Sequence, residues 1–154
     1  MHCLSKGEVK EFSHSITLLL PYYLDEVFRL LFEDMGFSVI HSYKGDVLEE
    51  AVRTAPIDIA LEWQHGPEDY PIWDLLRKHN KSVPILLCLN WNGQFPRYFS
   101  SLGYQDYLNV PWTMDELMSK FHKALPESKK PILRVFWKRC KESRSRPGFQ
   151  TGHQ

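Results

Sequence analysis

The chain has 154 residues, of which 43% are hydrophobic and 25% charged, and its formal net charge is zero. This composition suits one domain with a hydrophobic core, and no apolar run approaches the roughly 20 residues that a membrane-spanning helix needs. The first residues lack the apolar centre of a signal peptide, and three isolated cysteines, Cys3, Cys88 and Cys140, provide no disulfide framework. These features predict a cytoplasmic protein without a transmembrane segment.

Charge is spread unevenly along the chain. Residues 129–154 hold eight Lys or Arg residues and one acidic residue, Glu142, which gives +7 and leaves −7 for the remainder. Such asymmetry points to an acidic partner for the basic end. The predicted division is a flexible N-terminal segment at 1–14, a folded domain at 15–126 and a basic C-terminal tail at 127–154.

Five apolar runs are predicted as β-strands. Several are apolar throughout, as "SITLLL" and "VPILLCLN" illustrate, which is typical of strands buried on both faces of a sheet. The predicted strands are residues 15–20, 37–42, 58–63, 83–90 and 104–110.

The segments between these runs carry apolar residues at helical spacing. Gly36 is a natural helix stop, Asp46 is a candidate N-cap and Pro71 fits the first turn of a helix. Thr113 and Glu116 have the spacing of a capping box. The predicted helices are residues 23–36, 44–55, 70–80, a short one near 95–102, and 113–125.

This alternation of strands and helices predicts an α/β fold with a doubly wound, five-stranded parallel sheet and helices on both faces. In such a sheet, functional sites lie beyond the carboxyl ends of the strands. Glu62 and Trp63 stand at the end of the third predicted strand. The sequence therefore raises the question whether Glu62 is a working carboxylate or marks a site that has been lost.

The chain resembles the receiver domain of two-component response regulators, the CheY-like fold, over roughly residues 15–126. The segment "LGYQDYLNVPWTMDEL" is similar to a segment of that family in its Gly, Asp-Tyr-Leu and Pro positions. The segment "EDMGFSVIHSYKGDVLEEAV" resembles the family's first helix end, second strand and following turn. The resemblance implies the flavodoxin-like strand order 2-1-3-4-5 and a signalling protein that acts by protein–protein contact.

Receivers accept a phosphoryl group on an Asp, helped by an acidic pair that holds Mg²⁺, a Thr or Ser, and a Lys. The resemblance assigns these positions to Pro21 and Tyr22 for the acidic pair, Trp63 for the acceptor, Leu89 for the hydroxyl and Val110 for the lysine. One inserted loop residue would place Glu62 at the acceptor position instead. Strand alternation points Glu62 and Trp63 to opposite faces, and we favour Trp63. We therefore expect a degenerate receiver that is not an enzyme and has no metal and no cofactor.

The resemblance also implies a docking face around the fourth helix, fifth strand and last helix. Tyr104, Tyr107 and Trp112 are the candidate partner-binding residues there, because aromatic side chains are favoured at interface centres. Tyr104 also suits a core position. The identity of the protein partner is not visible in the sequence.

The predicted tail supports a second hypothesis. Arg134, Lys138, Arg139 and Lys141 form a basic patch interleaved with apolar residues, as in segments that bind nucleic acid or an anionic membrane surface. The receiver-like body would then serve as a homodimer. A tail whose apolar residues dock on their own domain is equally consistent with the sequence. An enzyme that uses Glu62 and His65 is the least favoured alternative.

Overall fold

The computed structural model describes residues 15–21, 26–42, 44–63, 71–89, 104–109 and 112–144. Within this part of the chain, five parallel strands form one sheet in the order β2-β1-β3-β4-β5. The strands are β1 (Thr17–Leu19), β2 (Ser38–Ile40), β3 (Ile59–Trp63), β4 (Ile85–Leu89) and β5 (Asp106–Asn109). The predicted fold class and the strand order 2-1-3-4-5 are confirmed.

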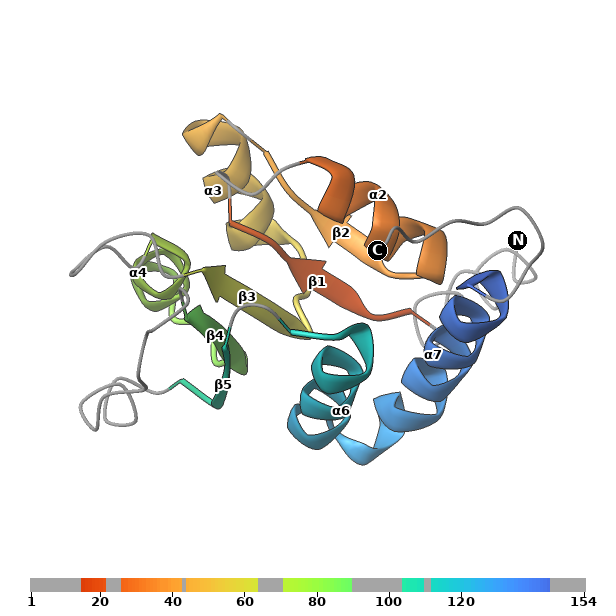
Figure 1. The fold of residues 1–154 in the computed structure, drawn as a ribbon. Coiled ribbons are helices and arrows are strands. Elements are labelled where there is room, and N and C mark those ends of the chain that lie inside the picture. The colour runs from red at the N-terminus through yellow and green to blue at the C-terminus, as the bar shows by residue number, and fades with distance from the viewer. Residues whose placement is uncertain are drawn as a thin grey trace, which may run out of the picture.

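Helices cover both faces of this sheet (Figure 1). On one face lie α2 (Glu26–Met35), α6 (Met114–Ala124) and α7 (Lys130–Arg144), and on the other lie α3 (Gly45–Thr54) and α4 (Pro71–Lys78). A short 3-10 helix, η1 (Glu127–Lys129), connects α6 to α7. Each face has its own cluster of buried apolar side chains, as expected for a sheet that is covered twice.

Local sequence signals set two of the helix ends as predicted. The Thr113 hydroxyl accepts a hydrogen bond from the Glu116 N–H at 3.1 Å, and the Glu116 carboxylate accepts one from the Thr113 N–H at 2.9 Å. This reciprocal capping box begins α6. Gly36 ends α2 with a φ of 124°, a backbone conformation that side chains other than hydrogen disfavour.

The prediction that Asp46 caps α3 is wrong. The N-cap is Lys44, whose side chain forms no capping hydrogen bond, and the helix begins at Gly45. Asp46 therefore lies inside the first turn, where its carboxylate accepts a hydrogen bond from the Val47 N–H at 2.9 Å. Its negative charge still favours the positive end of the helix dipole, so the residue type suits the position by a different mechanism.

The main difference from the sequence prediction is α7, which occupies much of the predicted tail. Leu133, Phe136 and Cys140 are buried in the same core cluster as α2 and α6. Phe136 packs so closely on the end of α2 that a Cβ added to Gly36 would lie 2.5 Å from its ring. Residue 126 therefore does not separate a folded body from a loose tail, because residues 130–144 form part of the core.

Several predicted features lie outside the described residues. These are the segment 1–14, the short helix near 95–102, Tyr22, His65 and Val110. Among the residues that the structure does describe, no helix is long and apolar enough to cross a membrane.

Candidate functional site

Glu62, near the carboxyl end of β3, is completely buried. Its carboxylate accepts hydrogen bonds from the backbone N–H of Trp73 at 2.9 Å, from the backbone N–H of Ile72 at 3.2 Å and from the Tyr104 hydroxyl at 3.2 Å. The side chain thus connects β3 to the first turn of α4 and to Tyr104, which lies two residues before β5. A buried charge is stable only when it is hydrogen-bonded in this way.

The sequence around α4 explains why a carboxylate is accommodated at this position. Pro71 is the first residue of the helix and has no N–H, and the next two amides lack partners within the helix. Glu62 supplies the acceptor for both from another element, and its negative charge lies at the positive end of the helix dipole. In the sequence, an acidic residue within an apolar strand indicates an unusual environment. The α4 amides that donate to Glu62 lie ten and eleven residues further along the chain, so the sequence does not identify them as its partners.

Trp63 points to the opposite face of the sheet, as strand alternation predicts. Its ring centroid lies 5.9 Å from that of Phe28 on α2 and 6.0 Å from that of Trp112 at the start of α6. The Phe28 and Trp112 centroids are 6.5 Å apart, so the three rings form one aromatic cluster. These are the separations at which aromatic pairs are favourable. The cluster packs against the core beneath α2 and α6.

Cys88 of β4 is paired with Trp63 in the sheet register. Burial raises the pKa of the Cys88 thiol to about 12, and the neighbouring Trp112 indole opposes this with a smaller lowering effect. The Trp112 Nε1 is itself buried, and among the described residues it has no hydrogen-bond partner of ordinary geometry. Sulfur is only a weak acceptor, so the indole and thiol meet in a largely apolar environment.

Of the five positions assigned to receiver chemistry, the structure describes Pro21, Trp63 and Leu89. Pro21 and Leu89 are buried, and Leu89 packs in the core beneath α3 and α4, on the face away from Trp63. The structure therefore places these residues at the carboxyl ends of their strands, with Trp63 and Leu89 on opposite faces of the sheet. In the described part of the chain, no group of three His, Cys, Asp or Glu residues could hold a metal ion.

The structure separates the three aromatics assigned to partner binding. Tyr104 is only 6% exposed and donates to Glu62, so its assignment to a partner surface is wrong. Tyr107 is half-buried at the β5 edge, where the Lys120 ammonium lies 5.5 Å from its ring and also donates to Asp106 at 3.0 Å. Trp112 is half-buried and packs on the core beneath α2 and α6, whereas Tyr107 packs on the core beneath α3 and α4.

The basic patch assigned to the tail is also divided. Arg134, Lys138 and Lys141 line one groove beside α6. Arg139 lies elsewhere on α7, where its guanidinium donates to the Met35 carbonyl at 3.0 Å and stacks 5.9 Å from the Phe136 ring centroid. Arg139 therefore fixes α7 to the end of α2, and it does not belong to the patch.

Comparisons with known proteins add to this picture. No family model matches the chain, and no curated protein matches its sequence. Its structure is similar to that of a CheY-like response regulator receiver domain protein from Methanospirillum hungatei JF-1, with a TM-score of 0.55 at 17% identity, covering 76% of this chain and 98% of that one.

Two further solved structures are similar to the same degree. The receiver domain of the sensor histidine kinase PA1611 from Pseudomonas aeruginosa PAO1, solved with a magnesium ion in its active site cleft, has a TM-score of 0.56 at 19% identity, covering 71% of this chain and 97% of that one. The chemotaxis protein CheY4 from Vibrio cholerae has a TM-score of 0.56 at 14% identity, covering 72% and 98%. The chain has the fold of CheY-like receiver domains.

Proposed function

We propose that this protein is a receiver-like signalling protein that takes up no phosphoryl group and acts by binding another protein. The observation that carries the proposal is the state of Glu62, the carboxylate at the end of β3. It is completely buried and accepts hydrogen bonds from α4 and Tyr104. A phosphoryl acceptor has to be open to its donor, whereas this carboxylate is enclosed within the molecule.

The neighbouring positions support the same conclusion. Magnesium is bound through oxygen ligands, several of them carboxylates, and magnesium and a lysine neutralise the transferred group in phosphoryl transfer. Here the described positions hold Pro21, Trp63 and Leu89, whose side chains carry no oxygen. Trp63 is engaged in the aromatic cluster with Phe28 and Trp112. We therefore propose that the protein is not an enzyme of phosphotransfer, and that Trp63 replaces the acceptor.

Phosphorylation can be tested directly with a small donor. The full chain is incubated with acetyl phosphate and Mg²⁺ beside a conventional receiver domain as positive control, and both are examined by intact-mass measurement. We expect a phosphoryl adduct on the control and none on this chain. A Mg²⁺-dependent adduct on this chain, mapped to the end of β3, would contradict the proposal.

The proposed docking face is the edge formed by β5 and α6. Among the described residues β5 is the last strand of the sheet, and an edge strand can offer its backbone groups to a partner. Tyr107, Asp106 and Lys120 form a connected group along this edge. We propose Tyr107 as the aromatic anchor of this interface, because its side chain is half-buried and packs against the sheet. We also propose that the protein works in a reducing compartment, the cytoplasm, because the thiols of Cys88 and Cys140 are free.

This face is tested by affinity capture with two variants. Tyr107→Ala should weaken recovery of the partner about tenfold, as expected when an anchor worth about 1.4 kcal/mol is removed. Lys44→Ala, at the exposed start of α3, is the control and should leave recovery unchanged. If recovery survives Tyr107→Ala, the β5–α6 edge is not the docking face.

A nucleic-acid-binding regulator remains the second candidate function. The specific observation in its favour is that Arg134, Lys138 and Lys141 share one groove. Salt-dependent binding of an oligonucleotide would be its signature. The homodimer that accompanies this candidate stays a prediction, which sedimentation of the full chain would test.

A further inference from the structure

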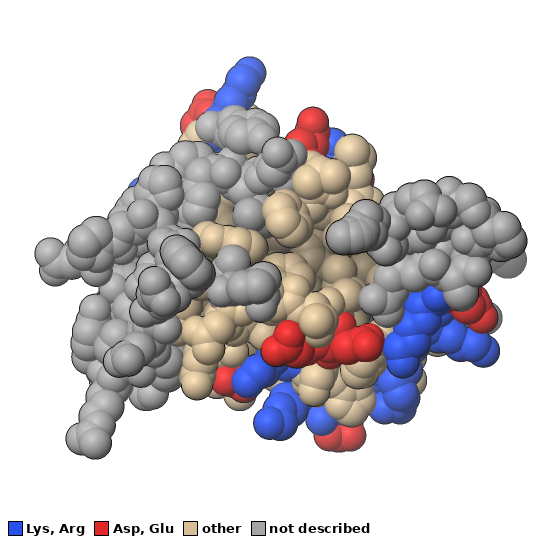
Figure 2. Space-filling view, viewed as in Figure 1, with Lys and Arg blue, Asp and Glu red and all other residues tan. Residues whose placement is uncertain are grey.

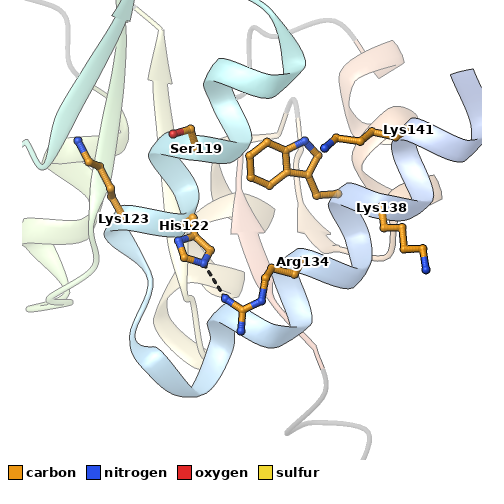
Figure 3. A pocket seen from close by; sticks show the side chains of 7 residues that line it. Ser119, His122, Lys123, Arg134, Lys138 and Lys141 are labelled. Atoms are coloured by element: carbon orange, nitrogen blue, oxygen red, sulfur yellow. Dashed lines mark hydrogen bonds between the residues drawn. The ribbon is translucent and has the colours of Figure 1, made fainter.

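We propose that the groove between α6 and α7 is a binding site for a short acidic peptide segment of a partner protein. Figure 3 shows the groove, whose volume is about 430 Å³. Its lining residues are Ser119, His122, Lys123, Arg134, Trp137, Lys138 and Lys141. This site is distinct from the β5–α6 edge, and it does not depend on the function proposed above.

The two helices of the groove form an antiparallel hairpin closed by η1 (Figure 1). At one end the Arg134 guanidinium reaches across from α7 and donates to His122 Nε2 on α6 at 2.9 Å. A guanidinium can only donate, so His122 Nε2 acts as the acceptor in this arrangement. The contact fixes the spacing between the helices before any ligand binds, which reduces the ordering that binding requires.

At the other end the groove is closed by Trp137. Its indole N–H donates to the Asp115 carboxylate at 2.7 Å, and the Lys141 ammonium lies 4.8 Å from the centre of its ring. The indole is half-buried against the core, so it provides a rigid apolar surface in the groove. Lys141 reaches it from the next turn of α7, as Figure 3 shows.

Positive charge surrounds this apolar surface. Arg134, Lys138 and Lys141 project from one face of α7 along about 10 Å of helix, at about 1.5 Å per residue. Lys123 lies on the α6 side, and both Lys123 and Lys138 extend outward at the rims of the groove (Figure 3). Among the described residues neither of these two lysines forms an ion pair. Their charges are therefore available to a ligand.

The groove is bounded by negative charge, which favours a short ligand over a polymer. Asp115 lies at the Trp137 end. Glu127 lies at the Arg134 end, where Lys130 lowers its pKa most and the charge of Arg134 lowers it further. Figure 2 shows basic side chains over α7 next to acidic ones over the beginning of α6. A nucleic-acid strand would have to run past these carboxylates, whereas a few acidic side chains would fit between them.

The chemistry of the groove matches a peptide whose acidic residues flank an apolar one. The acidic side chains would meet Lys123, Lys138 and Arg134, while the apolar residue would lie on Trp137. A groove between two helices is also a common binding site for a third, amphipathic helix. A volume of about 430 Å³ accommodates a few side chains and falls in the range of ligand sites.

The test is fluorescence anisotropy of the full chain with a labelled synthetic peptide that carries Glu and Leu at helical spacing. The same peptide with Gln in place of Glu is the neutral control. We expect saturable binding of the Glu peptide and at least about tenfold weaker binding of the Gln peptide, since the charges are recognised across the groove. No binding of the Glu peptide would overturn the proposal.

Two charge-reversal variants distinguish binding of the peptide in the groove from long-range electrostatic attraction by the net charge. Lys138→Glu should weaken binding about tenfold, whereas Lys44→Glu, which changes the net charge equally at the exposed start of α3, should change it by less than about twofold. Equal effects of the two variants would mean that net charge alone attracts the peptide, and the proposal would fail. Circular dichroism of both variants excludes loss of the fold as the cause.

A local readout and a competing ligand complete the test. In NMR spectra the indole N–H of Trp137 should shift when the peptide binds, while the buried indole N–H of Trp112 should not. A single-stranded oligonucleotide of equal charge is titrated in parallel. If it binds more tightly than the peptide, and if Lys138→Glu weakens it more, the groove serves nucleic acid and the peptide assignment is wrong.

Discussion

Removing the Glu62 carboxylate should destabilise the fold more than removing any exposed acid. Glu62→Ala leaves two N–H groups of α4 and the Tyr104 hydroxyl buried without their acceptor. Each buried unsatisfied group costs about 1–3 kcal/mol, and partial relaxation or entry of water reduces the sum. We therefore expect a loss of about 3–5 kcal/mol from the free energy of unfolding, which for a small domain totals about 5–15 kcal/mol.

Three further variants isolate the cause. Glu62→Gln keeps an acceptor oxygen and loses the charge at the helix terminus, so its loss should be only about 1–2 kcal/mol. Tyr104→Phe removes one donor and should cost about 1 kcal/mol. Glu50→Ala on the exposed face of α3, where Glu50 pairs with Arg53, is the control and should change stability by less than about 0.5 kcal/mol.

Urea unfolding followed by circular dichroism measures these differences, provided that the slope with denaturant is unchanged. The double variant Glu62→Ala, Tyr104→Phe should be less destabilised than the sum of its parts by about 1 kcal/mol, because the orphaned hydroxyl is gone. Additive losses, or a Glu62→Ala loss no larger than that of Glu50→Ala, would refute the view that this carboxylate joins β3, α4 and Tyr104.

The remaining predictions concern the last two helices and the core thiol. Thr113→Ala should lower the free energy of unfolding by about 1 kcal/mol through loss of the capping box, measured by the same urea titration. Phe136→Ala should lower it by about 3–5 kcal/mol, whereas Val135→Ala, 55% exposed on the same helix, should change it by less than about 1 kcal/mol. Because burial raises the pKa of Cys88 to about 12, this thiol stays protonated and should resist iodoacetamide at pH 8 until the protein unfolds, as peptide mapping after alkylation would show. Since the folded-state pKa is raised, the stability linked to this proton is present below the pKa of the unfolded thiol and declines as pH rises toward 12.

Much of the fold is predictable because its determinants are local. Apolar runs and helical spacing identify the strands and most helices that the structure describes, and the Thr113 and Gly36 signals mark helix ends correctly. The bounds differ by at most three residues, and both ends of α3 differ by one. Asp46 was assigned to the wrong cap position because the helix begins one residue before it.

The role of Glu62 was not predictable because its partners are distant in sequence. An acid in an apolar strand signals an unusual environment, but only the fold places the amides of α4 and the hydroxyl of Tyr104 around it. The helix α7 was missed for a different reason. Leu133, Phe136 and Cys140 have helical spacing, yet the basic residues between them dominate the composition of the segment.

The arrangement around Glu62 also bears on how such a protein would be regulated. One carboxylate holds the end of β3, the start of α4 and the approach to β5 at the same time. A switch needs an element with two arrangements whose populations a ligand or modification can shift. Here the carboxylate that would have to be released is buried, and breaking its contacts would leave several buried donors without a hydrogen-bond acceptor. The proposed signalling role therefore favours a single fixed conformation of the β5–α6 edge, so that a partner would respond to the amount of protein or to occupancy of the α6–α7 groove, and not to a phosphorylated state.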